Sequence, residues 1–326
     1  YRFLLGDLKS ARYQHSSKLL IIPDGILAQL PFEALITDLG DTTYMDYSGL
    51  PYLIREACIG YAYSATLLFS PKKEYKKNEN NLLAFSYSGL NTLGENTMRT
   101  GNDIELPHTA VELNAIKAVF PGRNQYFFDE EATENAFKEN APEYQILHLA
   151  VHGFADTVNG DDSMLKFKLG NDTINDSYLY MHELYGMDLN NTLLAVLSAC
   201  ETGIGKEFRG EGVFSMARGF TYAGCPTVIM SLWPIGDEYS ASIMAGFYRL
   251  LEKGNNASES LRDAKLNFIK MQDELRTHPA NWASFVYLGD EFQYRSGING
   301  ILIFSIAVFL IIILFLFYKK KFHPVT

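Results

Sequence analysis

Short apolar runs recur along the chain, and turn residues separate them. The runs are almost continuously apolar instead of alternating with polar residues, which is typical of strands buried on both faces of a parallel sheet. They occupy residues 19–22, 82–88, 144–153, 192–200, 226–233 and 282–289. The sequence therefore predicts a sheet with both faces covered.

Segments with helical spacing of apolar residues lie between these runs. Thr109 opens one of them, and Glu112 follows three residues later, as in a capping box. The predicted helices are 109–120, 211–224, 237–254 and 256–272. Strands that alternate with helices predict an α/β fold with a mostly parallel sheet flanked by helices.

Composition narrows the class of protein. The chain has 326 residues, of which 47% are apolar and 13% aromatic, enough for a large core. Its formal net charge of −10 argues against a nucleic-acid partner, because phosphate binding needs clustered lysines and arginines. Three cysteines, Cys58, Cys200 and Cys225, are too few and too scattered for a disulfide framework or a zinc ribbon.

Two reactive side chains stand at the ends of predicted strands. His152 follows the run ILHLAV and precedes Gly153, and Cys200 ends the run LLAVLSAC. Ligands of such sheets bind at the carboxyl ends of the strands. A nearby imidazole raises the thiolate fraction of a cysteine, and the sulfur can then attack a carbonyl carbon. We expect His152 and Cys200 to be catalytic, with the N–H groups of Gly153 and Cys200 as an oxyanion hole.

Each of these residues, taken alone, also fits a structural role. A cysteine after an apolar strand is usually a small buried hydrophobic residue, and we interpret Cys58 and Cys225 in this way. A metal site is not expected, since His148 and His152 would lie ~13 Å apart on a strand. Acyl transfer by a thiol needs no metal and no organic cofactor.

Several blocks of the chain resemble, in order, those of the CHAT domain, a bacterial relative of caspases and separases. They lie within residues 17–290 and read LLIIPDGILAQLPFEAL, LPHTAVEL, ILHLAVHGFAD, VLSACETGIG, GEGVFSMARGFTYAGCPTVIMSLWPIGD, FYRLL and NWASFVYLGD. The resemblance implies a caspase-like fold and a cysteine endopeptidase with a His152–Cys200 dyad, acting on a protein or peptide substrate. The family commonly carries tetratricopeptide repeats upstream, so we expect a longer bacterial protein with a repeat or sensor domain before Tyr1.

Relatives in this group often select a charged residue beside the cleaved bond. A basic preference requires a carboxylate near the dyad, and Asp156 and Asp237 are the candidates. Each also fits a simpler role, as a solvated loop residue or, for Asp237, as a helix N-cap.

The alternatives to a peptidase are a catalytically silent or latent scaffold that binds proteins, and a thiol acyltransferase.

An uncharged apolar run, residues 300–318, is followed by three lysines at 319–321. As a helix it would be about 28 Å long, close to the thickness of a bilayer core. It predicts a single-pass protein of the bacterial inner membrane with its main domain outside the cytoplasm. The alternatives are a tail anchor with the domain inside and a buried core helix.

The expected parts of the chain are a domain 1–290, with an N-terminal subdomain 1–70 and a linker or loop 71–81, a juxtamembrane segment 291–299, a transmembrane helix 300–318 and a basic tail 319–326.

Overall fold

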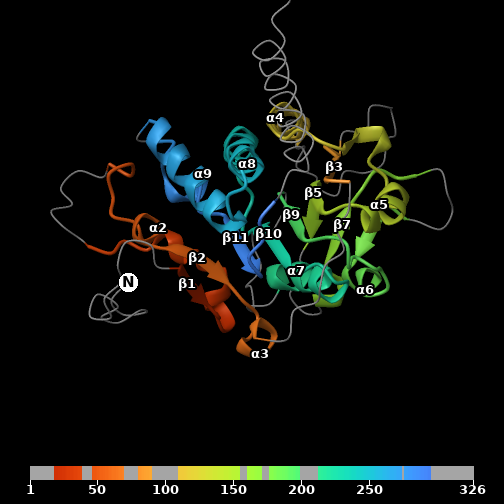
Figure 1. Cartoon of the computed structure of the whole chain (residues 1–326), viewed down its shortest axis with the longest axis horizontal. Coiled ribbons are helices and arrows are strands. Elements are labelled where there is room, and N and C mark those ends of the chain that lie inside the picture. Colours follow the sequence, from red (N-terminus) through yellow and green to blue (C-terminus); the bar gives the residue numbers. More distant parts are fainter. Residues whose placement is uncertain are drawn as a thin grey trace, which may run out of the picture.

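An eight-stranded sheet forms the centre of the part of the chain that the structure describes (Figure 1). This computed structural model describes residues 18–38, 46–69, 80–89, 109–154, 160–170, 176–198, 212–273 and 275–294. In spatial order the strands are β1 (Lys18–Ile21), β2 (Cys58–Tyr61), β11 (Phe285–Gly289), β10 (Thr227–Ser231), β9 (Leu194–Leu197), β5 (Ile146–Ala150), β3 (Leu82–Ser86) and β4 (Asn124–Phe128). Every neighbouring pair is parallel except β10 with β11, which confirms the predicted mostly parallel sheet.

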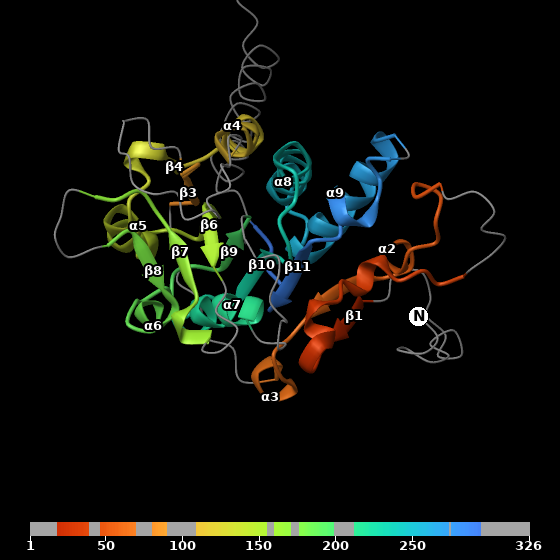
Figure 2. The same ribbon diagram turned by 180° about the vertical axis from the view of Figure 1, so that it is seen from behind.

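Helices cover both faces of this sheet (Figures 1 and 2). One face carries α4 (Thr109–Val119), α8 (Asp237–Glu252) and α9 (Ala257–Met271), and the other carries α5 (Glu134–Asn140), α6 (Met181–Leu184) and α7 (Gly212–Tyr222). Along β5, Ile146 and Ala150 belong to the hydrophobic core under α4, α8 and α9. Leu147 and Leu149 belong to the core on the opposite face, under α5, α6 and α7. Burial on both sides explains why the strand reads as a continuous apolar run.

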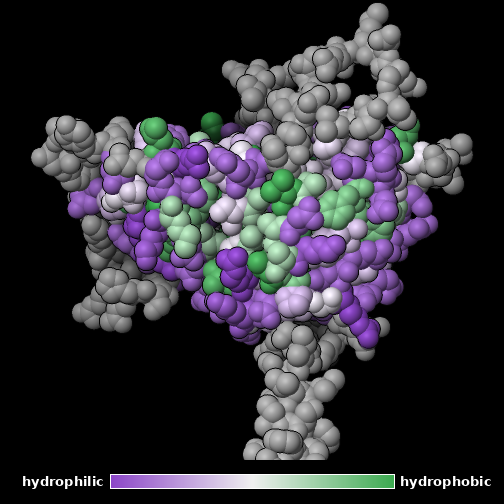
Figure 3. All heavy atoms as spheres, turned by 90° about the horizontal axis from the view of Figure 1, so that it is seen from above, coloured by the Kyte–Doolittle hydropathy of each residue, from purple (hydrophilic) through white to green (hydrophobic). Residues whose placement is uncertain are grey.

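The outer surface of the described chain is mostly polar where it is seen from above, over α4, α8 and α9 (Figure 3). Apolar side chains also lie on this face, several of them side by side. Val111 of α4 and Met271 of α9 are exposed apolar residues. Single exposed apolar side chains of this kind are ordinary on a protein surface.

Several short elements complete the described chain. A small antiparallel sheet contains β6 (His152–Phe154), β7 (Met164–Lys166) and β8 (Tyr178–Tyr180). The remaining short helices are α2 (Leu53–Glu56), α3 (Ala65–Leu68), η2 (Gly25–Gln29), η3 (Phe32–Ala34), η4 (Asp129–Glu131), η5 (Ala141–Glu143), η6 (Gly160–Asp162) and η7 (Pro279–Asn281). The small sheet was not predicted, because three-residue strands are too short to establish an alternating pattern.

A buried charged cluster joins η3 to α9 across β2. Lys265 Nζ lies 3.3 Å from Glu33 Oε1 and also donates to the carbonyl oxygen of Phe285. The Tyr61 hydroxyl donates to Glu33 Oε2 at 2.6 Å, and burial, followed by the charge of Glu33, raises the pKa of Tyr61. Since loss of one partner would leave a buried charge unpaired, this cluster ties the first described segment firmly to α9.

The predicted single-pass membrane location is corrected by the structure. No helix within the described ranges is long and apolar enough to cross a bilayer. Residues 300–318, on which the prediction rested, lie outside those ranges, as does the basic tail.

Candidate functional site

The carboxyl ends of four parallel strands, β4, β3, β5 and β9, lie next to one another at one edge of the sheet. The register pairs Phe128 of β4 with Ser86 of β3, and Ser86 with Ala150 of β5. It also pairs Leu149 of β5 with Leu197 of β9. The residues that follow these strands therefore leave the sheet at nearly the same level, where α/β proteins bind their ligands.

His152 follows β5 at this edge and begins β6 after a bend at Val151. The His152 side chain is 4% exposed, and its Nε2 lies 3.3 Å from the carbonyl oxygen of Ser88. Because a carbonyl oxygen can only accept, a hydrogen bond at this contact requires the proton to be on Nε2. The contact thus restrains the orientation of the imidazole ring.

Ser88 is held in turn by Asp129, the first residue after β4. The Ser88 hydroxyl donates to Asp129 Oδ1 at 3.0 Å, and the Ser88 N–H donates to the same oxygen at 3.4 Å. Asp129 has a φ of 37°, in the left-handed region that aspartate tolerates better than most residues. No residue that orients His152 could be predicted from the sequence. Asp129 was missed because β4, the strand that it follows, was not predicted.

Gly89 packs directly against His152, and we expect this position to reject a side chain. Its φ is +76°, and an added Cβ would lie 3.0 Å from His152 Nε2. Gly89→Ala should therefore cost about 1–2 kcal/mol of stability and displace the imidazole, slowing alkylation of Cys200 about tenfold or more. Gly25→Ala is the matched control, because Gly25 has a φ of +54° but nothing within 4 Å of its added Cβ. Equal alkylation rates in the two variants, measured by mass spectrometry, would contradict this prediction.

A buried polar cluster lies beneath the same edge, between the sheet and the helices α4 and α8. We call it the Glu112 cluster; its members are Glu112, His148, Ser198, Ser240 and Tyr248. Ser198 Oγ donates to Glu112 Oε1 at 2.5 Å, and Ser240 Oγ donates to Glu112 Oε2 at 2.6 Å. His148 Nε2 lies 3.0 Å from Glu112 Oε1, and His148 Nδ1 lies 3.1 Å from the Tyr248 hydroxyl. The carboxylate thus meets partners from β5, from the end of β9 and from α8.

Glu112 is ionised in this setting. Burial alone would raise its pKa, but hydrogen bonding and charge from His148, together with the hydroxyls of Ser198 and Ser240, outweigh burial and lower it. The spacing of Thr109 and Glu112 predicted a capping box. Instead, the Glu112 carboxylate accepts hydrogen bonds from Ser198, after β9, and from Ser240 of α8.

Two of the three cysteines lie within the described residues, and burial raises the pKa of both thiols. Cys225 is fully buried, its Sγ donates to the carbonyl oxygen of Thr227 at 3.2 Å, and burial raises its pKa to about 12. Burial also raises the pKa of Cys58 in β2. Both thiols suit the structural role predicted for them. Cys200 belongs to the segment 199–211, which lies outside the described residues.

The other predicted site residues fall in different places. Gly153 lies in β6 beside His152 and pairs with Leu165 of β7. Asp237 is the half-buried first residue of α8, with Gly236 as the N-cap, and Asp156 lies outside the described residues. The structure brings His152 and Gly153 together, while the roles of Gly153, Asp156 and Asp237 stay predictions.

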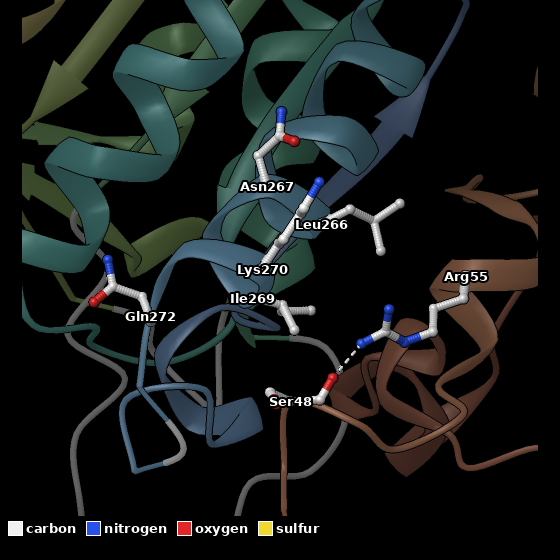
Figure 4. Close-up of a pocket in the computed structure, with 7 residues that line it drawn as sticks. All are labelled: Ser48, Arg55, Leu266, Asn267, Ile269, Lys270 and Gln272. Atoms are coloured by element: carbon white, nitrogen blue, oxygen red, sulfur yellow. Dashed lines mark hydrogen bonds between the residues drawn. The ribbon is translucent and has the colours of Figure 1, made fainter.

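A pocket of about 500 Å³ opens elsewhere, between the segment that contains α2 and helix α9 (Figure 4). Its lining residues are Ser48, Arg55, Leu266, Asn267, Ile269, Lys270 and Gln272. The Arg55 side chain already donates to the carbonyl oxygens of Ser48 and Leu50. None of the lining residues comes from the strand ends around His152, so we do not include this pocket in the site.

Comparison with protein families matches residues 1–290 to the CHAT domain. Tetratricopeptide repeat protein 28 of Mus musculus is 31% identical over 103 residues, which are 32% of this chain and 4% of that protein. The Homo sapiens protein of the same name is 28% identical over 110 residues, or 34% of this chain and 4% of its own length. The match thus spans a small part of these curated relatives, and their mammalian origin does not support the bacterial origin predicted from the sequence.

Solved structures give a looser likeness. The Saccharomyces cerevisiae separase–securin complex aligns with a TM-score of 0.48 and 13% identity, over 76% of this chain and 15% of that chain. The Arg-specific cysteine proteinase gingipain R aligns with a TM-score of 0.46 and 11% identity, over 73% of this chain and 55% of that chain.

Proposed function

Because the chain belongs to the CHAT domain family, we propose that it is a cysteine endopeptidase in which Cys200 is the nucleophile and His152 the base. The observation that carries the proposal is the setting of His152, buried at the carboxyl edge with Nε2 directed at the Ser88 carbonyl oxygen. The sequence position of Cys200 supports it further. Leu149 of β5 pairs with Leu197 of β9. His152 and Cys200 each come three residues after these paired leucines in the sequence.

In the proposed reaction, Nδ1 of His152 accepts the proton of the Cys200 thiol, and the sulfur adds to the carbonyl carbon of the substrate. The N–H groups of Gly153 and Cys200 donate to the oxyanion that forms. The C–N bond then breaks as Nδ1 returns the proton to the leaving amine. Water hydrolyses the resulting thioester, which releases the acid and restores the thiol.

The substrate in this proposal is a protein or a peptide. The curated relatives are named for tetratricopeptide repeats. For this reason the proposal includes an upstream repeat domain that recruits a protein partner. The charge preference at the cleaved bond would come from Asp156 or Asp237 if the preferred residue is basic.

Active-site labelling tests the proposal. The full chain is treated with peptidyl acyloxymethyl ketones that carry Arg, Lys or Asp at the reactive position, and adducts are located by mass spectrometry. We expect an adduct on Cys200 that disappears in His152→Ala, with Cys225 unmodified because its thiol is buried. The fastest probe identifies the charge preference, and Asp156→Asn and Asp237→Asn then show which carboxylate sets it. A folded chain that gives no adduct on Cys200 would favour the silent or latent scaffold instead.

A further inference from the structure

The Glu112 cluster contacts the strands that lead to both proposed catalytic residues. We propose that Glu112, His148 and Ser240 are positioning residues that fix the end of β9, the strand that precedes the proposed nucleophile in the sequence. This inference rests on the proposed function, since it concerns how the chain holds Cys200. None of these side chains is assigned a contact with the substrate.

Ser198 is the point at which the cluster holds β9. Its N–H donates to the carbonyl oxygen of Leu149 at 3.0 Å, which continues the pairing of β9 with β5 by one residue. Its hydroxyl donates to Glu112 and lies 3.0 Å from the hydroxyl of Ser240. Both the backbone and the side chain of Ser198 are thus fixed two residues before Cys200.

The same carboxylate also lies close to the strand that leads to His152. His148 belongs to β5, four residues before His152, and its Nε2 faces the Glu112 oxygen that accepts from Ser198. One oxygen atom of α4 therefore meets β5 and the end of β9 together. Through Ser240 and Tyr248, helix α8 restrains the other side of this contact.

Packing alone does not account for a carboxylate at this place. Glu112 is 4% exposed and His148 is fully buried, among apolar neighbours such as Ile146, Leu194 and Val196. Apolar residues of similar volume usually serve stability at least as well as buried ionisable groups. Directed hydrogen bonds add what apolar contacts lack, a defined geometry between neighbouring strands.

The test compares hydroxyl deletions that differ in their distance from the site. Ser198→Ala and Ser240→Ala remove the donors to Glu112, while Ser198→Thr restores a hydroxyl at the first position. Ser284→Ala is the matched control, because Ser284 is fully buried in the same fold and exchanges hydrogen bonds with the backbone of Trp233. For each full-length variant we would measure the melting temperature, kcat and KM on the best peptide, and the rate of Cys200 alkylation by iodoacetamide between pH 5 and 9.

We expect Ser198→Ala and Ser240→Ala to lower kcat about tenfold with KM changed less than twofold, and to alter the pH profile of Cys200 alkylation. Ser198→Thr should recover most of the loss. Ser284→Ala should lower the melting temperature to a similar extent and leave both the kcat and the profile unchanged. Variants at 198 and 240 that behave like Ser284→Ala would overturn this inference alone. A Cys200 that is unreactive in the unmodified chain would overturn the proposed function, and this inference with it.

Discussion

Replacing Cys200 by alanine is expected to abolish peptide hydrolysis, with a loss in kcat of at least about 10⁴-fold, since no other described thiol can take its place. Cys225 is buried with a pKa raised to about 12, and the pKa of Cys58 is raised as well. His152→Ala should lose about 10²–10⁴-fold, the usual contribution of a general base. Initial rates with the peptide chosen by the labelling experiment measure both effects.

Cys225→Ala serves as the control for the loss at Cys200. It also removes a thiol, and any fall in its melting temperature reports the effect of the small cavity that it leaves. We expect its kcat to stay within twofold of the unmodified chain. If Cys200→Ala kept its fold and its activity, the proposed nucleophile would be wrong.

Glu112→Gln is expected to lower the free energy of unfolding by about 1–3 kcal/mol at pH 7, because it replaces a buried carboxylate that accepts hydrogen bonds from Ser198 and Ser240. His148 faces Glu112 from β5, Ser240 and Tyr248 face the pair from α8, and Ser198 follows β9. The pKa of Glu112 is lowered in the folded state. The ionised carboxylate therefore stabilises the fold above the pKa of an unfolded glutamate, about 4.3, and this stabilisation is lost as the pH falls through the lower folded value.

Urea unfolding between pH 7 and pH 3 measures this dependence. The difference in the free energy of unfolding between the unmodified chain and Glu112→Gln should be largest near neutral pH and shrink below about pH 4. Glu130→Gln is the control, because Glu130 is an exposed partner of Lys168 and should contribute less than about 1 kcal/mol. A difference that stays constant across this range would show that the charge of Glu112 does not stabilise the fold.

Much of the central sheet could be predicted because its strands are buried on both faces. The runs around β3, β5, β9 and β10 are continuously apolar, and α8 and α9 begin within a residue of the predicted starts. Strand β4 was missed because its sequence, NQYFF, is only half-buried and mixes polar with aromatic residues at the edge of the sheet. The pattern reports burial, so it fails where burial is incomplete.

The residues of the candidate site could likewise be predicted only in part from the sequence. His152 was found because a histidine at the end of an apolar strand is visible in one segment of sequence. The carbonyl oxygen of Ser88 and the carboxylate of Asp129 were not found, because their roles depend on which strands are neighbours. Glu112 was misread as part of a capping box, since spacing along a helix does not show which of its faces meets the sheet.

The pairing of Glu33 with Lys265 has a consequence for how the chain is made. The two residues are 232 positions apart, and β2 pairs with β11, which is also near the end of the described chain. At a synthesis rate of about 5–20 residues per second, the ribosome needs on the order of 10–50 s to add the partners of η3 and β2. During that interval the glutamate has no lysine, and one edge of the β1–β2 pair has no neighbouring strand. The first described segment therefore cannot complete its native contacts until these late partners have been synthesised, and until then it stays open to chaperones, proteases and wrong partners.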